Sequence, residues 1–329
     1  ILNGFLSVYG YTCNINRKSL LDLARKLSKR FNEKRKIEVK DLETVHVKKV
    51  NKISEHLKDV PITEKVSYCR ETSKIIQNVD PRIVRTIVSF SDSLKNIQIW
   101  NAEGEKGKHF ITHEERGRLS MLAVAKEGNN IESFSYAPGR CASWDYFKNT
   151  LPWKEFAQKV GEKAIALLSA KECPQGKFDV VVANGWGGVV FHEACGHSLE
   201  AAATAKKLSV FSESIGKQIA SPLVSAYDDG TMPNEWGSND LDSEGNKTQK
   251  IQLIKDGICT SFLVDKLNGR RLGMEANGTS RRQSYRYEPT SRMSNTYIAP
   301  VKENPEEIIK DTKLGIYVVY FGGGSVETT

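Results

Sequence analysis

The sequence contains no uninterrupted apolar stretch approaching the roughly 20 residues that a membrane-spanning helix needs. Residues 1–12 also lack the basic flank and the long apolar core of a signal peptide. The first absence argues against a helical membrane protein; the second argues against a signal peptide within the given residues, while a signal removed with a missing N-terminus would not be visible. With 329 residues, of which 39 % are hydrophobic, the chain has the length of one large domain or two ordinary ones and reads as a soluble globular protein.

Cysteine pairs of the CxxC kind are absent as well. The six cysteines are scattered along the chain and form no short framework of the kind found in disulfide-rich secreted domains. Scattered thiols in a chain of this length favour a reducing compartment. We therefore expect reduced cysteines and a cytoplasmic protein.

The net charge of +8 is concentrated near the N-terminus, where residues 1–60 hold 14 Lys and Arg against 7 Asp and Glu. Binding of nucleic acid would also need interleaved aromatic residues or a known binding module, and neither is present. A solvated helical face is the preferred interpretation. A nucleic-acid-associated regulator is an alternative. If the protein binds DNA only weakly and loses that binding in moderate salt, the binding is a non-specific effect of its charge.

Helical and strand patterns are mixed along the chain. Apolar periodicity and capping residues predict helices at 18–34, after Pro61, at 154–170 and at 304–314. In the helix after Pro61, we expect Val66, Cys69 and Ile76 to face inward. Alternating residues and turn signals predict three hairpins, at 95–100 with 108–112, 117–125 with 131–136, and 248–254 with 258–264. The fold class is therefore α+β, with largely antiparallel sheets and packed helices.

A turn-rich stretch at 171–175 is the best candidate boundary between two domains. We expect an N-terminal α+β domain at 1–172 and a C-terminal domain at 173–329. Because the chain starts at Ile1 rather than at methionine, we also expect the first domain to lack its native N-terminus.

The run "GWGGVVFHEACGHSLE" at 185–200 gathers two histidines, two glutamates and a cysteine. In the common zinc-protease motif the two histidines are four residues apart, so they share one helical face. His192 and His197 are five apart, which on a regular helix places them about 140° from each other, at 100° per residue. A π-bulge, or a helix that ends at Gly196, would bring the two imidazoles together. We predict one of these two distortions.

Each side chain of this run has a chemical role if a metal binds. Neutral imidazoles are good zinc ligands, so His192 and His197 are the candidate ligands. Glu193 follows the first ligand directly and would accept a proton from metal-activated water. Glu200 would serve as a partner of a ligand or as a further ligand. The pattern alone is weak, because two histidines and a glutamate in six residues also occur as ordinary helix content.

The surrounding motifs are more specific. The "GWGGVVFHEA" approach is followed in order by "SVFS" (209–212), "DDGT" (228–231), "DKLNGRRLGM" (265–274), "GTSRRQSY" (278–285), "RMSNTYI" (292–298) and "GIYVVYFGGGSV" (315–326). In this series the chain resembles the TldD branch of the TldD/PmbA family, historically called modulators of DNA gyrase and now read as metalloproteases. The resemblance is strong from about residue 80 onward.

The resemblance implies a two-domain TldD/PmbA-like fold with the metal motif on a central helix. It also implies a zinc-dependent peptidase that cleaves unfolded or extended peptides in a narrow cleft. Such a protein often works as a dimer, with a second copy or with a PmbA-type subunit. By position, His192 and His197 match the family's zinc-binding histidines and Glu193 its catalytic glutamate.

One position of the family pattern is missing. The third zinc ligand of the family is a cysteine well past the FGGG motif, whereas this chain stops at Thr329. Two protein ligands fall short of the three that a catalytic zinc normally has. We therefore expect the C-terminal domain to be truncated, and a non-catalytic peptide-binding or regulatory subunit is the alternative function. Cys195 lies inside the motif and is interpreted as a small buried apolar residue.

Further residues are candidates for substrate contact. Gly322, Gly323 and Gly324 would let a peptide backbone approach closely or simply form a tight bend. Tyr285 or Tyr287 would donate a hydrogen bond to an oxyanion or be an ordinary core or rim tyrosine. The pairs Arg270/Arg271 and Arg281/Arg282 would hold a peptide carboxylate or an acidic side chain, or form surface salt bridges.

Overall fold

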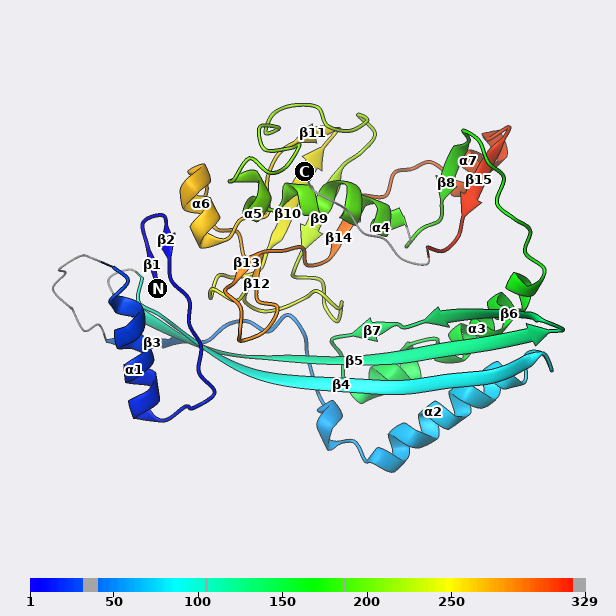
Figure 1. Ribbon diagram of the computed structural model, residues 1–329, viewed down its shortest axis with the longest axis horizontal. Helices are drawn as coiled ribbons and strands as arrows, with labels where there is room; N and C mark the ends of the chain where they lie inside the picture. Colours follow the sequence, from blue (N-terminus) through cyan, green and yellow to red (C-terminus); the bar gives the residue numbers. More distant parts are fainter. Residues whose placement is uncertain (32–40, 104–105, 186, 322–329) are drawn as a thin grey trace.

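The computed structural model describes residues 1–31, 41–103, 106–185 and 187–321 (Figure 1). Its α-helices are α1 Arg17–Ser28, α2 Ile62–Gln77, α3 Trp153–Leu168, α4 Gly187–Phe191, α5 Ala201–Thr204, α6 Lys266–Leu272 and α7 Pro305–Asp311. Short 3-10 or π turns are η1 Leu57–Asp59, η2 Tyr146–Thr150, η3 His192–Gly196 and η4 His197–Leu199. Within these ranges, no helix has both the length and the apolarity to cross a bilayer.

The strands form several separate sheets. They are β1 Leu2–Asn3, β2 Leu6–Ser7, β3 Leu42–Val45, β4 Ile83–Asn101, β5 Gly107–Glu127, β6 Asn130–Tyr136, β7 Gly139–Arg140, β8 Asp179–Val182, β9 Ala226–Asp229, β10 Lys250–Lys255, β11 Ile258–Cys259, β12 Ser280–Arg281, β13 Thr290–Ser291, β14 Thr296–Ile298 and β15 Gly315–Val318. Most pairs are antiparallel; β3 with β5 and β8 with β15 are the parallel ones among the described strands. The predicted α+β class with largely antiparallel sheets is confirmed.

The longest strands organise the N-terminal half. β4 pairs with β5 along almost its full length, and β5 then pairs with β6 and β7. The two hairpins predicted here are therefore consecutive parts of one meander, because β5 is a single strand of 21 residues that serves both turns. Its side chains alternate between buried and less buried, as a strand covered on one face requires.

Helices α2 and α3 cover one face of this sheet, where α2 packs on β4 and α3 on β5 and β6 (Figure 1). Phe147 and Leu57 lie at 0 % exposure in the core between them. The ring of Phe147 is 5.0 Å from that of Phe90, edge to face. Gly117 allows this packing, since a Cβ there would lie 2.7 Å from the Phe147 ring.

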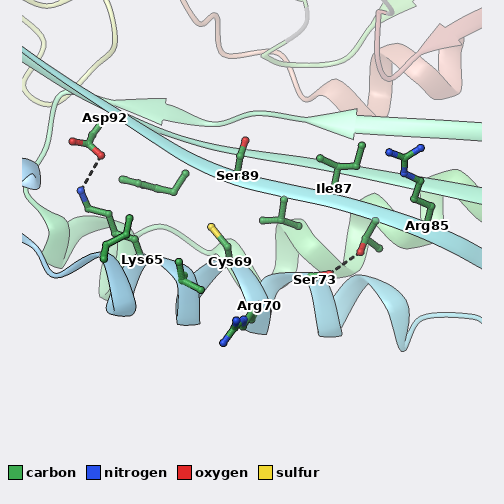
Figure 2. A pocket seen from close by; sticks show the side chains of 13 residues that line it. Lys65, Cys69, Arg70, Ser73, Arg85, Ile87, Ser89 and Asp92 are labelled. Atoms are coloured by element: carbon green, nitrogen blue, oxygen red, sulfur yellow. Dashed lines mark hydrogen bonds and ion pairs between the residues drawn. The ribbon is translucent and has the colours of Figure 1, made fainter.

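The buried face of α2 differs from the expected one. Ile76 is buried as expected, but Val66 is 38 % exposed and Cys69 is only half-buried, and Lys65 and Tyr68 are buried in their place. The helix is rotated by about one residue because the Tyr68 ring packs in the aromatic core and its hydroxyl donates to the Phe147 carbonyl, 3.0 Å away. An open cleft of about 650 Å³ remains between α2 and β4, and Figure 2 shows Lys65 closing one end by its 2.9 Å ion pair with Asp92.

A second antiparallel sheet, in the order β11-β10-β9-β14, lies above the long strands in Figure 1. Its core is a separate apolar cluster that includes Phe191, Leu199, Leu253 and Phe262. Two of these residues flank the histidine motif, so burial of Phe191 and Leu199 anchors both ends of that motif. The predicted division of the chain into 1–172 and 173–329 stays a prediction.

Two of the predicted helix boundaries have visible causes. The Asn16 side chain accepts from the Ser19 amide at 2.9 Å and begins α1, and the Asn304 side chain accepts from the Glu306 amide at 3.0 Å and begins α7. Pro305 is the first residue of α7. α7 ends at Asp311, four residues before the Gly315 stop that the sequence indicates.

Candidate metal centre

The histidine motif departs from regular helical geometry at the expected place. α4 ends at Phe191, η3 from His192 to Gly196 is a π turn, and η4 continues as a 3-10 turn. The His197 amide donates to the His192 carbonyl, five residues back, which is the hydrogen bond that defines a π turn. The prediction of a local distortion is confirmed, in its π-bulge form.

This distortion brings the two imidazoles together. The ring centroids of His192 and His197 are 4.7 Å apart, and the planes meet at 87°. One ligand-type atom each from His192, Glu193 and His197 all lie within 4.8 Å of one another. Two zinc–nitrogen bonds span at most about 4.2 Å, so the donor set fits a zinc-sized ion after only small side-chain rotations.

The electrostatics of the two histidines favour their neutral form. Burial lowers the pKa of His192, and the neighbouring His197 lowers it further. Burial likewise lowers the pKa of His197, with additional lowering by the positive charges of Arg292 and Arg281. Neutral imidazoles are the form that binds a metal. At neutral pH, each imidazole therefore has one nitrogen lone pair available to bind a metal.

Glu193 stands beside this pair. Its Oε1 is 4.0 Å from the His192 Nε2, and its side chain is 25 % exposed. The carboxylate is thus both near the imidazoles and open to solvent, as an acceptor of a proton from water must be.

Glu200 is a buried hydrogen-bond partner of His197. It is 5 % exposed; its Oε1 lies 3.2 Å from the His197 Nδ1, and its Oε2 accepts from the Arg292 Nη1 at 3.1 Å. Burial raises the pKa of Glu200 to about 7 against the opposing effect of Arg292. A carboxylate on Nδ1 fixes the ring orientation and leaves Nε2 as the nitrogen facing the other ligands.

The glycine of the motif makes room for a distant segment. A Cβ on Gly196 would lie 2.1 Å from the Met293 Sδ, so only glycine permits the present packing. Met293 is itself 5 % exposed. Arg292 and Met293 were part of a quoted motif but had no assigned role in the sequence interpretation. Their place in "RMSN" is the only signal that pointed to them.

The remaining candidates lie in different surroundings. The Tyr285 hydroxyl is 3.5 Å from the Cys13 Sγ and accepts from the Arg286 Nε at 3.3 Å, so it contacts the N-terminal segment; its role toward a substrate stays a prediction. Gly322, Gly323 and Gly324 lie outside the described residues. Cys195 is half-buried against the second apolar cluster, and burial raises its thiol pKa.

Comparison with known families matches both halves of the chain. Residues 175–329 match the family described as PmbA/TldA metallopeptidase C-terminal domain, and residues 55–168 match the PmbA/TldA metallopeptidase central domain. The metalloprotease TldD homolog of Buchnera aphidicola subsp. Schizaphis graminum is 32 % identical over all of this chain and 68 % of its own length. That of Haemophilus influenzae is 35 % identical over 76 % of this chain and 52 % of its own length.

Among the more distant relatives, one is named as a zinc enzyme and two have solved structures of a similar fold. A protein of Saccharolobus solfataricus named zinc metalloprotease TldD homolog is 24 % identical over 80 % of this chain and 58 % of its own length. A crystal structure from Thermotoga maritima, named for modulation of DNA gyrase, has a TM-score of 0.73 at 19 % identity and covers 94 % of this chain and 67 % of its own. TldE from Thermococcus kodakarensis has a TM-score of 0.68 at 18 % identity, covering 93 % and 67 %. At these identities the two structures show the fold.

Proposed function

This chain belongs to the PmbA/TldD metallopeptidase family, and from that premise we propose that it is a zinc-dependent peptidase acting on unfolded or extended peptides. The observation that carries the proposal is the π turn, which places His192, Glu193 and His197 within 4.8 Å of one another. Such a turn costs helical hydrogen-bond geometry and is a frequent feature of functional sites.

His192 and His197 would hold the zinc. A bound zinc would supply a Lewis acid that makes water nucleophilic at neutral pH and polarises a carbonyl. The third ligand is proposed to be the cysteine that the family resemblance implies, which would lie outside the 329 residues. Glu200 keeps the His197 ring in place through its 3.2 Å contact to Nδ1.

Glu193 would perform the proton transfers. Its carboxylate accepts a proton from the attacking water and then delivers that proton to the leaving amine. Its 4.0 Å distance from the His192 Nε2 places it next to the pair of ligands without blocking either imidazole. General acid–base catalysis of this kind contributes roughly 10²–10⁴-fold to the rate.

An extended substrate would pair with a strand edge beside the motif. β14 pairs with β9 on one side, and α4 and η3 lie against β14. Among the described strands, β14 is at the edge of its sheet. Main-chain pairing there would accept peptides with little regard to side chains.

The test compares full-length wild type with Glu193→Gln. We expect both proteins to contain one zinc per chain by elemental analysis, and the variant to lose at least 100-fold in cleavage of an unfolded reporter peptide. Glu172→Gln, in the exposed 171–175 segment, is the matched control and should cleave like wild type. Undiminished cleavage by Glu193→Gln refutes the assigned role.

A second function remains open to the same experiment. Among the described residues only two imidazoles converge, one ligand short of a usual catalytic zinc site. A full-length protein without stoichiometric metal that still binds peptides would therefore be a non-catalytic peptide-binding or regulatory subunit. We further propose that the protein pairs with a second copy or with a PmbA-type subunit; its cytoplasmic location stays a prediction.

A further inference from the structure

A cavity of about 460 Å³ is lined by the segment from Arg281 in β12 to Arg292, just after β13. This volume is within the range of sites for small ligands, about 300–1,000 Å³. Its charged and aromatic lining consists of Arg281, Arg282, Arg292, Tyr287 and Glu288. The lining holds three guanidinium groups and one carboxylate, and although Arg292 is paired with Glu200 outside the lining, the remaining charge is positive and favours an anion.

The three arginines are not equally engaged. Arg292 forms the ion pair with Glu200, and Arg282 donates from Nη1 to the Tyr287 carbonyl at 3.0 Å while it packs over the Tyr9 ring. For the Arg281 guanidinium no hydrogen bond or short ion pair is found within the described part of the chain, although the charges of Glu200 and Glu114 act on it at longer range. A planar guanidinium with its fork unpaired matches the two oxygens of a carboxylate.

The cavity adjoins the metal centre. Arg292, in its wall, contacts Glu200, and Glu200 contacts His197, with distances of 3.1 Å and 3.2 Å. An anion in the cavity is therefore within a few side-chain lengths of the imidazoles.

We propose that this cavity binds a carboxylate of the peptide substrate, with Arg281 as its main bidentate partner and Arg282 beside it. The inference rests on the proposed peptidase function and adds a substrate preference to it: cleavage close to a free C-terminus or close to an acidic side chain. A singly charged carboxylate suits the site better than a phosphate, because Glu288 also lines the cavity and repels additional negative charge.

The test measures binding separately from cleavage. Three fluorescein-labelled decapeptides of Gly, Ala, Ser and Leu are titrated by anisotropy against the full-length Glu193→Gln protein. One ends in a free carboxylate, one in an amide, and one in an amide with a single Glu near the end. We expect at least one carboxylate-bearing peptide to bind 10-fold or more tightly than the neutral amide.

Variants connect this preference to the cavity. Arg281→Gln, introduced into the same protein, should abolish the difference in affinity between the carboxylate-bearing and the neutral peptides. Arg281→Lys should retain part of this difference, because it keeps the positive charge but cannot form the bidentate contact of a guanidinium. Arg286→Gln is the matched control, since Arg286 is exposed in the same segment but does not line the cavity. Equal thermal stability of Arg281→Gln and Arg286→Gln excludes misfolding as the cause.

Each outcome decides the proposal. Tight binding of the free acid alone assigns the terminal carboxylate, and tight binding of the Glu-containing amide assigns an acidic side chain. Equal affinity for all three peptides, or an unchanged preference in Arg281→Gln, overturns the proposal. Since the readout is binding, missing zinc or missing cleavage would refute the peptidase function while this result stays readable.

Discussion

Glu244 is a partly buried carboxyl whose replacement should stabilise the protein in a pH-dependent way. Its Oε2 accepts from the Lys266 amide at the first residue of α6, 2.9 Å away. The Lys266 ammonium does not neutralise it, because that group forms an ion pair with Glu103 at 2.5 Å. Burial raises the pKa of Glu244 to about 7, and the nearby Asp242 and Asp265 raise it too.

The size and sign of the effect follow from this pKa. The ordinary pKa of a glutamate is 4.5, and that of folded Glu244 is about 7. Between these two pH values, the unfolded chain has released the Glu244 proton that the folded protein still holds. The free energy of unfolding therefore falls as pH rises through this window. At 1.36 kcal/mol for each pH unit, the full loss is about 3 kcal/mol. Glu244→Gln keeps an oxygen acceptor for the Lys266 amide and removes the buried charge.

The assay is the melting temperature Tm of wild type and Glu244→Gln at pH 5, 6, 7 and 8, both free of metal. We expect nearly equal Tm values at pH 5 and a variant more stable at pH 8 by about 6–12 °C, since 1 kcal/mol moves Tm by about 2–4 °C for a domain of 150–250 residues. Glu275→Gln, which removes an exposed carboxylate, should change stability by less than about 0.5 kcal/mol. A Tm difference that does not depend on pH, or a less stable variant at pH 8, refutes the reasoning.

Two further predictions concern the metal centre. Glu200→Gln removes the carboxylate that orients His197 and should weaken zinc binding by the full-length protein about 10–100-fold in a chelator competition; an unchanged affinity contradicts the orienting role. Gly196→Ala places a methyl group against the Met293 sulfur in a buried site and should cost about 1–3 kcal/mol of stability. Adding Met293→Ala to Gly196→Ala should restore part of the lost stability, because it removes the clashing side chain. An unchanged Tm in Gly196→Ala would contradict the prediction, since it would mean that Met293 moves aside at no cost.

Local interactions made the sequence interpretation reliable in particular places. Asn16 and Asn304 begin α1 and α7 because a capping side chain bonds to amides two or three residues away. The five-residue spacing of His192 and His197 implied a π distortion, because the rotation per residue of a helix is a local constant. In these cases the interacting groups are neighbours along the chain.

Other features were missed because they depend on segments far apart in sequence. The buried face of α2 includes Lys65 and Tyr68 because Lys65 forms an ion pair with Asp92 and the Tyr68 hydroxyl donates to the Phe147 carbonyl. Both partners lie outside α2, so the periodicity of the helix does not reveal this face. Similarly, the two predicted hairpins share the single long strand β5, because β4 and β6 both pair with it.

The sequence by itself predicted that His192, Glu193 and His197 would carry the chemistry, which stays a prediction. It also predicted that the helix holding them must deform, which the π turn confirms, since both inferences depend on residue type and on spacing within a few turns. Only the tertiary structure decided what surrounds them: Glu200 paired with Arg292, Met293 packed on Gly196, and Arg281 in the wall of the neighbouring cavity. The physical reason is that burial and charge at the centre come from the 281–293 segment, which is about 90 residues away along the chain and adjacent only after the second sheet has formed.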